Sequence, residues 1–455
     1  MKSKLFGSSG SRGLVNVDLT PVLVAKIGMA IATFSRAKRI LVARDTRASG
    51  LMLEDALVSS LLACGVDVDC LGVLPTPVLA YLTREVKADV GVMITASHNP
   101  PQYNGVKIFD GSGMAYTAEN QRKIEEIVKN ENFRLADWRS IGKVHAIDVC
   151  QLYVEMMRKA VKLHRKWHVV VDPGCGATHA LAPMIFKALG CRVSAINAHP
   201  DGFFTARSPE PNAKSLKPLA RVIQEFGADV GVAYDGDGDR VAFIDERGHF
   251  VDFDRVLAAY AAYVVRKVGG GCVVTNVEAS MGVEKMVKAA GGRVVRTSVG
   301  DVHIAEAIRR HNALFGGEPC GAWIHPKFHY CPDGLLSSVL FLKALEDEGL
   351  KPSEFTAEVP RYSILRENVT CRNEIKQKVM EKVEQALKLA FPKYKECLKI
   401  DGIRLSLRGG WILVRASGTE PLVRLTVEGE SVELAREIME KGMSLVKKLA
   451  EEVEK

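Results

Sequence analysis

The stretch Asp229-Val-Gly-Val-Ala-Tyr-Asp-Gly-Asp-Gly-Asp-Arg-Val-Ala-Phe-Ile-Asp245 sets three carboxylates between two apolar runs. Both runs read as strands, so Asp235, Asp237 and Asp239 fall on the loop that joins them. Three like charges this close repel one another, and a positive group must offset them. A hard divalent cation such as Mg²⁺ takes oxygen ligands and keeps positions open for water or phosphate. The stretch therefore predicts metal-assisted phosphate chemistry, with Arg240 as a donor fork for the phosphate.

Two other structures are consistent with part of this stretch. Asp and Gly are common in turns, but three carboxylates followed by an arginine are unusual in a plain hairpin. An EF-hand calcium loop has glycine at its sixth position and helices on both sides. This chain has Arg240 at that position and strand-like flanks, so we reject the calcium loop.

The composition is that of a globular protein with two to four domains. The chain has 455 residues, of which 25% are charged and 47% hydrophobic, which argues against both disorder and a membrane protein. Its net charge of +8 comes from basic residues spread along the chain, a pattern that suits acidic small substrates at least as well as nucleic acid. The N-terminal residues lack the apolar core of a signal peptide. The ten cysteines form no Cys-x-x-Cys pair, so we expect a cytoplasmic protein with neither a zinc site nor a disulfide framework.

Strand-like and helix-like segments alternate through most of the chain, which predicts α/β layers. A second unit begins near residue 149 and a third opens after Gly248. The expected strands are 39–43, 89–94, 168–172, 192–196, 272–275 and 293–296, and the expected helices are 51–64, 181–189 and 256–268. The glycine-rich turn 173–177 lacks the G-x-G-x-x-G spacing, so a dinucleotide site is not supported.

The last part of the chain follows a different pattern. Segments 403–407 and 411–415 read as a hairpin, and 422–427 as a third strand. A final helix has apolar residues at helical spacing that predict one buried face: Leu434, Ile438, Leu445 and Leu449.

A second polar loop, Thr95-Ala-Ser-His-Asn-Pro100, follows a buried strand. Alpha/beta folds place ligands at such strand ends. Ser97 needs a base, a metal or a special environment to act as a nucleophile, and Lys107 is near enough in sequence to supply charge or move a proton. A polar capped turn without catalysis is the alternative.

Three further loops offer donors or carboxylates. Arg415-Ala-Ser-Gly-Thr-Glu-Pro-Leu-Val-Arg424 has the donors of a phosphate cradle, although a plain turn between strands is equally consistent. In the glycine-rich loop 316–321, Glu318 either accepts hydrogen bonds from sugar hydroxyls or is solvated. The N-terminal loop 6–13 carries Arg12. By contrast, His325 and His329 near Cys331 match no metal spacing, and we expect them to be ordinary core or surface residues.

Together these loops resemble those of the α-D-phosphohexomutase family, in the family's order along nearly the whole chain. Phe6–Gly13 matches the family's N-terminal loop, Thr95–Pro100 its phosphoserine loop and Asp235–Arg240 its metal loop. Gly317–Gly321 matches its sugar-specificity loop, and Arg415–Glu420 its phosphate loop. The resemblance implies an α/β architecture of four domains around a central cleft. Three related α/β domains would occupy 1–148, 149–248 and 249–364, and a smaller C-terminal α+β domain 365–455.

By this resemblance, Ser97 carries a covalent phosphate, with a hexose 1,6-bisphosphate as its candidate primer. Mg²⁺ is bound by Asp235, Asp237, Asp239 and the Ser97 phosphate. The implied catalytic residues are Ser97, His98, Lys107, Arg12 and Arg240; the substrate-binding residues are Gly300, Asp301, Glu318 and Cys320; and the phosphate-binding residues are Arg415, Ser417, Gly418, Thr419 and Arg424. Phospho-Ser97 would donate to a hexose monophosphate, and the resulting bisphosphate would turn over and return its other phosphate.

The substrate expectation rests on departures from the family pattern. The family's sugar loop often reads Gly-Glu-x-Ser-Gly-His, whereas Cys320 removes a hydroxyl donor here and Ala322 a possible imidazole. This variant is similar to the archaeal branch thought to act on glucosamine phosphates, and Asp301 is placed to meet an ammonium group. We expect interconversion of glucosamine 6-phosphate and glucosamine 1-phosphate, with glucose or mannose phosphates as the alternative.

Two other classes compete with the mutase. A phosphotransferase with Asp235 or Asp237 as nucleophile fits the acidic loop but not the other loops. A non-catalytic sugar-phosphate binding protein is opposed by the intact Ser97 and aspartates. The expected partner is a hexose or hexosamine phosphate, with no nucleic acid and no membrane, and a homodimer is left open.

Overall fold

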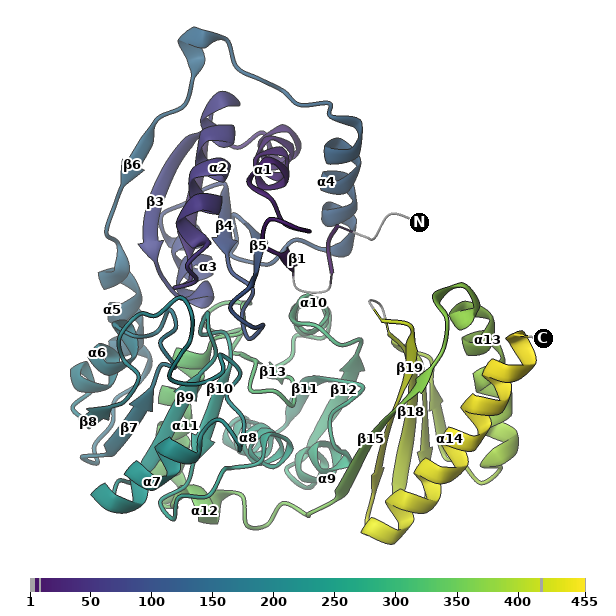
Figure 1. The fold of residues 1–455 in the computed structure, drawn as a ribbon. Helices are drawn as coiled ribbons and strands as arrows, with labels where there is room; N and C mark the ends of the chain where they lie inside the picture. Colours follow the sequence, from purple (N-terminus) through teal and green to yellow (C-terminus); the bar gives the residue numbers. More distant parts are fainter. Residues whose placement is uncertain (1–4, 8–9, 418–419, 455) are drawn as a thin grey trace.

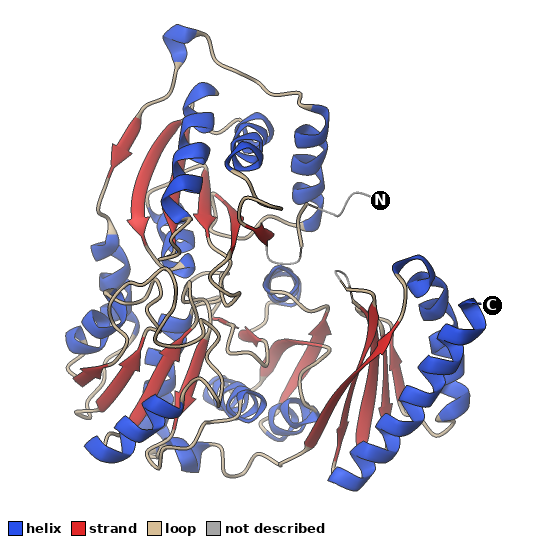
Figure 2. Ribbon diagram, in the orientation of Figure 1, coloured by secondary structure: helices blue, strands red, loops and turns tan. Residues whose placement is uncertain are grey.

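Four sheets, each with its own helices, make up the computed structural model, which describes residues 5–7, 10–417 and 420–454 (Figures 1 and 2). The first three sheets mix parallel and antiparallel pairs, whereas the fourth is antiparallel throughout. In Figure 1 the first sheet lies at the top, the second and third below it, and the fourth to one side. The predicted succession of three α/β units and a different C-terminal unit is confirmed.

The first unit has a six-stranded sheet of order β1-β5-β4-β2-β3-β6. Its strands are β1 (Ser11–Leu14), β2 (Arg39–Arg44), β3 (Asp67–Val73), β4 (Val90–Ile94), β5 (Tyr103–Asp110) and β6 (Val144–Ala146). Its helices are α1 (Pro21–Ser35), α2 (Gly50–Ala63), α3 (Thr76–Glu85) and α4 (Ala118–Asn130), with a short 3-10 helix at Trp138–Ser140. Ile40 and Val42 pack into the core with α1, α2 and α4, and Leu41 and Ala43 into the core with α3. This alternation is what a strand buried on both faces requires.

The second unit has a four-stranded sheet of order β10-β9-β7-β8. Its elements are α5 (Cys150–Ala160), β7 (His168–Asp172), α6 (Leu181–Ala188), β8 (Arg192–Ala195), α7 (Lys217–Phe226), β9 (Val230–Tyr234) and β10 (Val241–Ile244). Strands β9 and β10 form an antiparallel hairpin. The acidic loop is therefore the connection of that hairpin and not a helix-flanked calcium loop.

The third unit has a sheet of order β12-β11-β13-β14. Its strands are β11 (Gly271–Asn276), β12 (Gly292–Thr297), β13 (Phe315–Gly317) and β14 (Trp323–Ile324). Its helices are α8 (Phe253–Val268), α9 (Met281–Ala289), α10 (Asp301–His311), α11 (Gly334–Glu348) and α12 (Pro352–Phe355). Helix α8 begins three residues before the predicted start because the Asp252 side chain accepts from Arg255 N and caps the helix.

The fourth unit has a five-stranded sheet of order β15-β19-β18-β17-β16. Its elements are β15 (Ser363–Thr370), α13 (Asn373–Ala390), β16 (Glu396–Leu398), β17 (Ile403–Leu407), β18 (Gly410–Ala416), β19 (Leu422–Gly429) and α14 (Val432–Glu454). The predicted hairpin of β17 and β18 is present. Helix α14 packs against the sheet through Ile438 and Leu449, with Leu434 and Leu445 beside them, as predicted.

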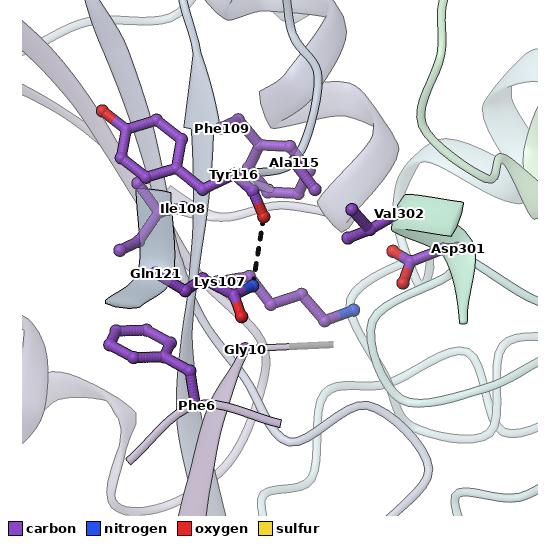
Figure 3. A pocket seen from close by; sticks show the side chains of 10 residues that line it. All are labelled: Phe6, Gly10, Lys107, Ile108, Phe109, Ala115, Tyr116, Gln121, Asp301 and Val302. Atoms are coloured by element: carbon purple, nitrogen blue, oxygen red, sulfur yellow. Dashed lines mark hydrogen bonds between the residues drawn. The ribbon is translucent and has the colours of Figure 1, made fainter. Parts of the chain in front are cut away.

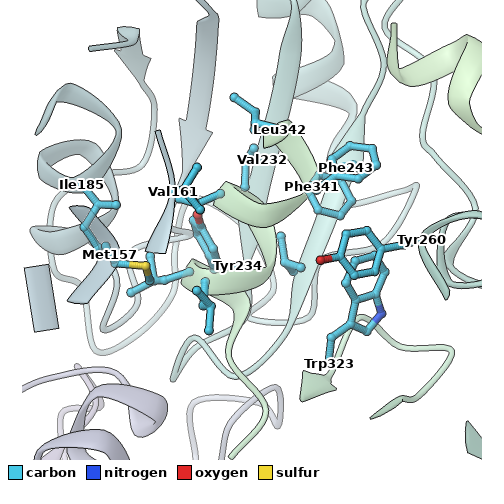
Figure 4. Close-up of a cluster of buried hydrophobic side chains, with 14 of the residues drawn as sticks. Met157, Val161, Ile185, Val232, Tyr234, Phe243, Tyr260, Trp323, Phe341 and Leu342 are labelled. Carbon is cyan, nitrogen blue, oxygen red and sulfur yellow. The ribbon is translucent and has the colours of Figure 1, made fainter. Parts of the chain in front are cut away.

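One hydrophobic core joins the first three units and holds the acidic loop in place. Figure 4 shows part of it, where the ring of Trp323 on β14 lies between rings from β10 and α8, and the β10 ring also contacts one from α11. The rings of Phe243 and Phe341 lie 4.2 Å apart, and the hydroxyl groups of Tyr234 and Ser338 share a hydrogen bond of 2.8 Å. Because Tyr234 and Phe243 belong to the two strands of the hairpin, the loop between them has a rigid base.

Other expectations concern cysteine, histidine and membranes. All ten cysteine residues are free thiols, six of them buried. His325 and His329 are buried and hydrogen-bond to Ser337 and Asp333, which confirms them as core residues. No helix among the described residues is long and apolar enough to cross a bilayer.

Candidate active site

The three aspartates of the β9–β10 loop converge on one point. Carboxylate oxygens of Asp235, Asp237 and Asp239 lie within 4.8 Å of one another, and all three residues are buried. Asp235 Oδ1 accepts from the backbone of Gly238 and Arg240 at 3.0 and 3.2 Å, which closes the loop around it. Gly238 adopts φ +75°, a left-handed conformation that glycine adopts without strain.

The predicted meeting of Ser97 with this acidic loop is present. Ser97 Oγ donates to Asp235 Oδ2 at 2.6 Å, although the two residues are 138 apart in sequence. A Cβ on Gly236 would lie 2.5 Å from Ser97 O, so glycine at this position is what lets the two loops touch. Ser97 has φ +52°, and its N–H donates to Thr95 Oγ1 at 2.8 Å.

Burial and mutual repulsion dominate the electrostatics of the aspartates. Burial, together with the charges of Asp239 and Asp237, raises the pKa of Asp235; burial and the charge of Asp237 likewise raise the pKa of Asp239. Burial alone would also raise the pKa of Asp237, but Lys107 outweighs it and the pKa is lowered. In the described part of the chain, Asp237 Oδ1 and Asp239 Oδ1 are buried without a hydrogen-bond partner. These oxygens fit a hard divalent cation, which would satisfy them and offset the repulsion.

Lys107 on β5 brings a positive charge to the same point. Its Nζ lies 2.7 Å from Asp237 Oδ2 and 2.6 Å from Asp239 Oδ2. Burial lowers the pKa of Lys107, but the two carboxylates outweigh burial and the pKa is raised overall. Of the two roles considered for Lys107, supplying charge is therefore favoured over moving a proton. Figure 3 shows its amino group beside a small cavity that Asp301 also lines.

Two arginines and a histidine complete the surroundings of Ser97. Arg12 Nη1 donates to Asn99 Oδ1 at 2.8 Å, and its Nε is buried without a partner among the described residues. Arg240 Nε lies 4.0 Å from Asp239 Oδ1. His98 Nδ1 is 3.3 Å from Ser97 Oγ. Burial, with the charges of Arg240 and Arg12, lowers the pKa of His98 to about 2, so its imidazole is neutral.

Arg47 was missed in the sequence analysis and fixes the serine loop. Its buried guanidinium pairs with Asp45 and donates to four backbone oxygens, those of Ser97, Asn99, Pro100 and Tyr103, at 2.6 to 2.8 Å. The polar run Asp45-Thr-Arg47, directly after a buried strand, was the available signal. Thr76 was also missed; its hydroxyl donates to Asp237 Oδ2 and its N–H to Asp237 O.

The sugar-loop residues are placed around Glu318. Glu318 is buried, and its Oε1 accepts from Asn276 Nδ2 at 2.8 Å and from Gly300 N at 2.9 Å. The alternative that Glu318 is merely solvated is therefore wrong. Burial raises the pKa of Cys320 to about 12, so this residue stays a neutral thiol. Val241 N donates to Gly321 O at 3.1 Å, which ties the sugar loop to the metal loop.

The predicted phosphate loop joins β18 and β19. Arg415 Nη1 donates to Asp401 Oδ2 at 2.8 Å, and its Nη2 lies 3.0 Å from Glu278 Oε1. Ser417 Oγ accepts from Glu420 N at 3.1 Å, and Arg424 pairs with Glu420. Gly418 and Thr419 lie outside the described residues.

Comparison with known proteins identifies the family. Models of domains I, II and III and of the C-terminal domain of phosphoglucomutase/phosphomannomutase match residues 3–135, 151–248, 252–362 and 368–443 in that order. The chain belongs to the phosphoglucomutase/phosphomannomutase family. It is accordingly an enzyme of the phosphohexomutase class, with that family's four-domain fold.

Relatives of this phosphohexomutase cover it from end to end. A probable phosphoglucosamine mutase of Pyrococcus abyssi is 44% identical over 98% of each chain, and a phosphoglucosamine mutase of Methanococcus maripaludis is 41% identical over 98% of each. Among solved structures, a phosphoglucomutase/phosphomannomutase family protein of Burkholderia thailandensis has a TM-score of 0.89 at 28% identity, covering 98% of this chain and 97% of that one. A putative phosphomannomutase of Thermus thermophilus has a TM-score of 0.82 at 27% identity, covering 98% and 100%.

Proposed function

We propose that this phosphohexomutase is a phosphoglucosamine mutase that uses Ser97 as its phosphoryl carrier. The observation that carries the catalytic proposal is the 2.6 Å contact between Ser97 Oγ and Asp235 Oδ2 at a buried carboxylate triplet. The substrate proposal is supported by relatives named phosphoglucosamine mutase at 41–44% identity over nearly the whole chain.

In the proposed reaction, the O1 oxygen of glucosamine 6-phosphate attacks the phosphorus of phospho-Ser97. The bond from phosphorus to Ser97 Oγ breaks as the new bond forms, which gives a sugar 1,6-bisphosphate. The proton of O1 passes to Ser97 Oγ in this step. After the bisphosphate turns over, Ser97 Oγ attacks its 6-phosphate and gives that proton to O6, so Ser97 is phosphorylated again and glucosamine 1-phosphate leaves. The net change moves one phosphoryl group within the substrate, and no further reactant is consumed.

Asp235, Asp237 and Asp239 would hold Mg²⁺ together with an oxygen of the Ser97 phosphate. A bound Mg²⁺ supplies a positive charge that offsets the charge of the transferring phosphoryl group. Lys107, Arg12 and Arg240 add fixed positive charge on the side of Ser97. Neutral His98 contributes a hydrogen bond to Ser97 Oγ without adding charge. Priming of Ser97 by a hexose 1,6-bisphosphate belongs to the same proposal.

The sugar and its non-reacting phosphate are assigned to the other two loops. Glu318, Gly300, Asp301 and Cys320 would face the sugar, with Asp301 toward the ammonium group. The phosphate that is not reacting would bind at Arg415, Ser417, Gly418, Thr419 and Arg424. Because the bisphosphate presents a phosphate to this loop in both orientations, one anchor serves both half-reactions. The boundaries at residues 148, 248 and 364, a cytoplasmic location and a homodimer stay predictions.

A side-by-side assay of three substrates tests the proposal. We expect kcat/KM for glucosamine 6-phosphate to exceed that for glucose 6-phosphate and mannose 6-phosphate. A tenfold or greater preference for mannose 6-phosphate would replace the substrate and leave the mutase intact. Labelling the protein with phosphate and treating it with hydroxylamine separates the carriers: an aspartyl phosphate is cleaved, whereas phospho-Ser97 keeps its label. Label that never passes between protein and sugar would indicate a binding protein.

A further inference from the structure

A chain of hydrogen bonds starts at the sugar-loop carboxylate and runs through the third unit. Glu318 Oε1 accepts from both Asn276 Nδ2 and Gly300 N. On its other side, Asn276 Oδ1 accepts from Glu278 N at 2.9 Å. The same buried carboxylate thus holds the start of α10 and the end of β11.

The chain then crosses to the fourth unit and returns. Glu278 Oε1 lies 3.0 Å from Arg415 Nη2, and Arg415 Nη1 donates to Asp401 Oδ2 at 2.8 Å. The same Asp401 oxygen accepts from Val299 N at 3.3 Å. Since Val299 is bonded to Gly300, the contacts form a closed circuit, which we call the interdomain ring; its members are Glu318, Asn276, Glu278, Arg415, Asp401, Val299 and Gly300.

The period of strand β18 explains why Arg415 can enter this ring. Ile412 and Val414 pack into the core with α13 and α14. Trp411 and Leu413 point to the opposite face and pack with Val277, Met281 and Val299 of the third unit. Arg415 follows Leu413 by two residues, so its side chain is directed at the third unit too.

We propose that Glu278 and Asp401 are positioning residues, which set the guanidinium of Arg415 and couple it to the sugar-facing segment 299–301. The proposal rests on the assignment of Arg415 to the non-reacting phosphate. Arginine has five N–H donors in a fixed plane. Glu278 of the third unit contacts one terminal nitrogen of Arg415, and Asp401 of the fourth unit accepts from the other. Together the two carboxylates fix the plane of the guanidinium at the boundary between these units. A phosphate that binds Arg415 in this orientation also holds Asp401 in place, and with it the hydrogen bond from Val299 N. By reciprocity, sugar contacts that order segment 299–301 favour phosphate binding.

The first test compares Glu278→Gln, Asp401→Asn and the double variant with glucosamine 6-phosphate as substrate. We expect each single variant to lower kcat/KM about tenfold, almost entirely through a higher KM, with kcat within threefold of the parent. The kcat/KM of the double variant should lie within about twofold of that of the less active single variant, because one break already opens the ring. A kcat/KM that falls about a hundredfold in the double variant, as for two independent effects, would overturn the proposal. A lower KM in either single variant would overturn it too.

Two carboxylates of ion pairs outside the ring supply matched controls. Glu348→Gln removes the partner of Arg266 in the third unit, and Glu384→Gln the partner of Lys388 and Lys399 in the fourth. Both controls should keep the parent's KM. A rise in KM as large as that of Asp401→Asn would show that general loss of charge, and not the ring, is responsible.

The second test needs no turnover and measures amide hydrogen exchange in a peptide that contains Val299 and Gly300. Glu278→Gln touches neither amide, yet it should speed their exchange at least threefold through Arg415 and Asp401. Inorganic phosphate should slow this exchange in the parent but not in Asp401→Asn. Unchanged exchange in Glu278→Gln would overturn the ring.

The two tests separate this proposal from the proposed function. If no hexose phosphate turns over but Glu278→Gln still speeds exchange at Val299, the function is wrong and the ring stands. If the mutase is active and exchange is unchanged, the function stands and the ring is wrong.

Discussion

At the scale of single residues, the Ser97 hydroxyl is the group on which the proposed chemistry depends. Ser97→Ala removes the phosphoryl carrier while leaving the loop's backbone contacts with Arg47 in place. We expect kcat to fall by on the order of a thousandfold or more, with the thermal midpoint nearly unchanged. Ser60→Ala, which removes another buried serine hydroxyl, is the control and should keep full activity. Near-normal turnover by Ser97→Ala would reject the carrier.

Asp254 gives a prediction of how stability depends on pH. Burial raises its pKa to about 7, although its Oδ1 accepts from Ser280 N. The folded state keeps this proton up to that pH, whereas the unfolded chain loses it near 3.8, the ordinary pKa of an aspartate. Stability attributable to Asp254 therefore falls as pH rises from about 4 to 7 and is constant above that.

Asp254→Asn should remove this penalty, because asparagine has no such proton to lose and can still accept from Ser280 N. The gain in unfolding free energy should grow to about 4 kcal/mol at pH 8 and be much smaller at pH 5. Thermal unfolding of the variant and the parent at the two pH values checks it. The exposed Asp252→Asn provides the comparison, and a gain of equal size at both pH values would contradict the assignment.

At the scale of elements, the serine loop depends on Arg47 in the segment that follows β2. Its guanidinium reaches four backbone oxygens and Asp45, a pattern that the single ammonium of lysine cannot reproduce. Arg47→Lys should therefore cost about 3 kcal/mol of stability and lower kcat more than tenfold by releasing the loop. Thermal unfolding and steady-state kinetics measure the two effects. Arg44→Lys, at the last residue of β2 and with one ion pair to Glu54, should affect activity little; equal losses in the two variants would argue against a special role for Arg47.

At the scale of the whole molecule, the metal loop of the second unit and the serine of the first share one site. We expect EDTA to abolish activity and Mg²⁺ to restore it. Mg²⁺ at a hundred times its dissociation constant should stabilise the fold by about 3 kcal/mol, since it binds the folded state only. Thermal unfolding with EDTA and with Mg²⁺ measures the shift. Asp239→Asn should reduce it, and the same shift in that variant would place the bound ion elsewhere.

The sequence by itself determined the features that depend on neighbours along the chain. The alternation of 403–407 and the apolar flanks of Asp235–Arg240 predicted strands that the structure contains, because side-chain periodicity reports which faces are buried. The ordered loops also sufficed to indicate the family. The start of α8 was misplaced by three residues. A single capping aspartate, Asp252, is a weaker signal in the sequence than the apolar run that follows it.

Only the tertiary structure decided which distant groups meet. Nothing in the spacing of the sequence shows that Arg47 reaches Ser97 or that Thr76 reaches Asp237. The same holds for Asp401 and Arg415. Those contacts arise where strand ends from different sheets pack together, and packing depends on the shapes of whole units and not on local periodicity. The charge states of the site follow from the same cause, because the pKa values of Asp235 and His98 are set by burial among groups that the fold assembles.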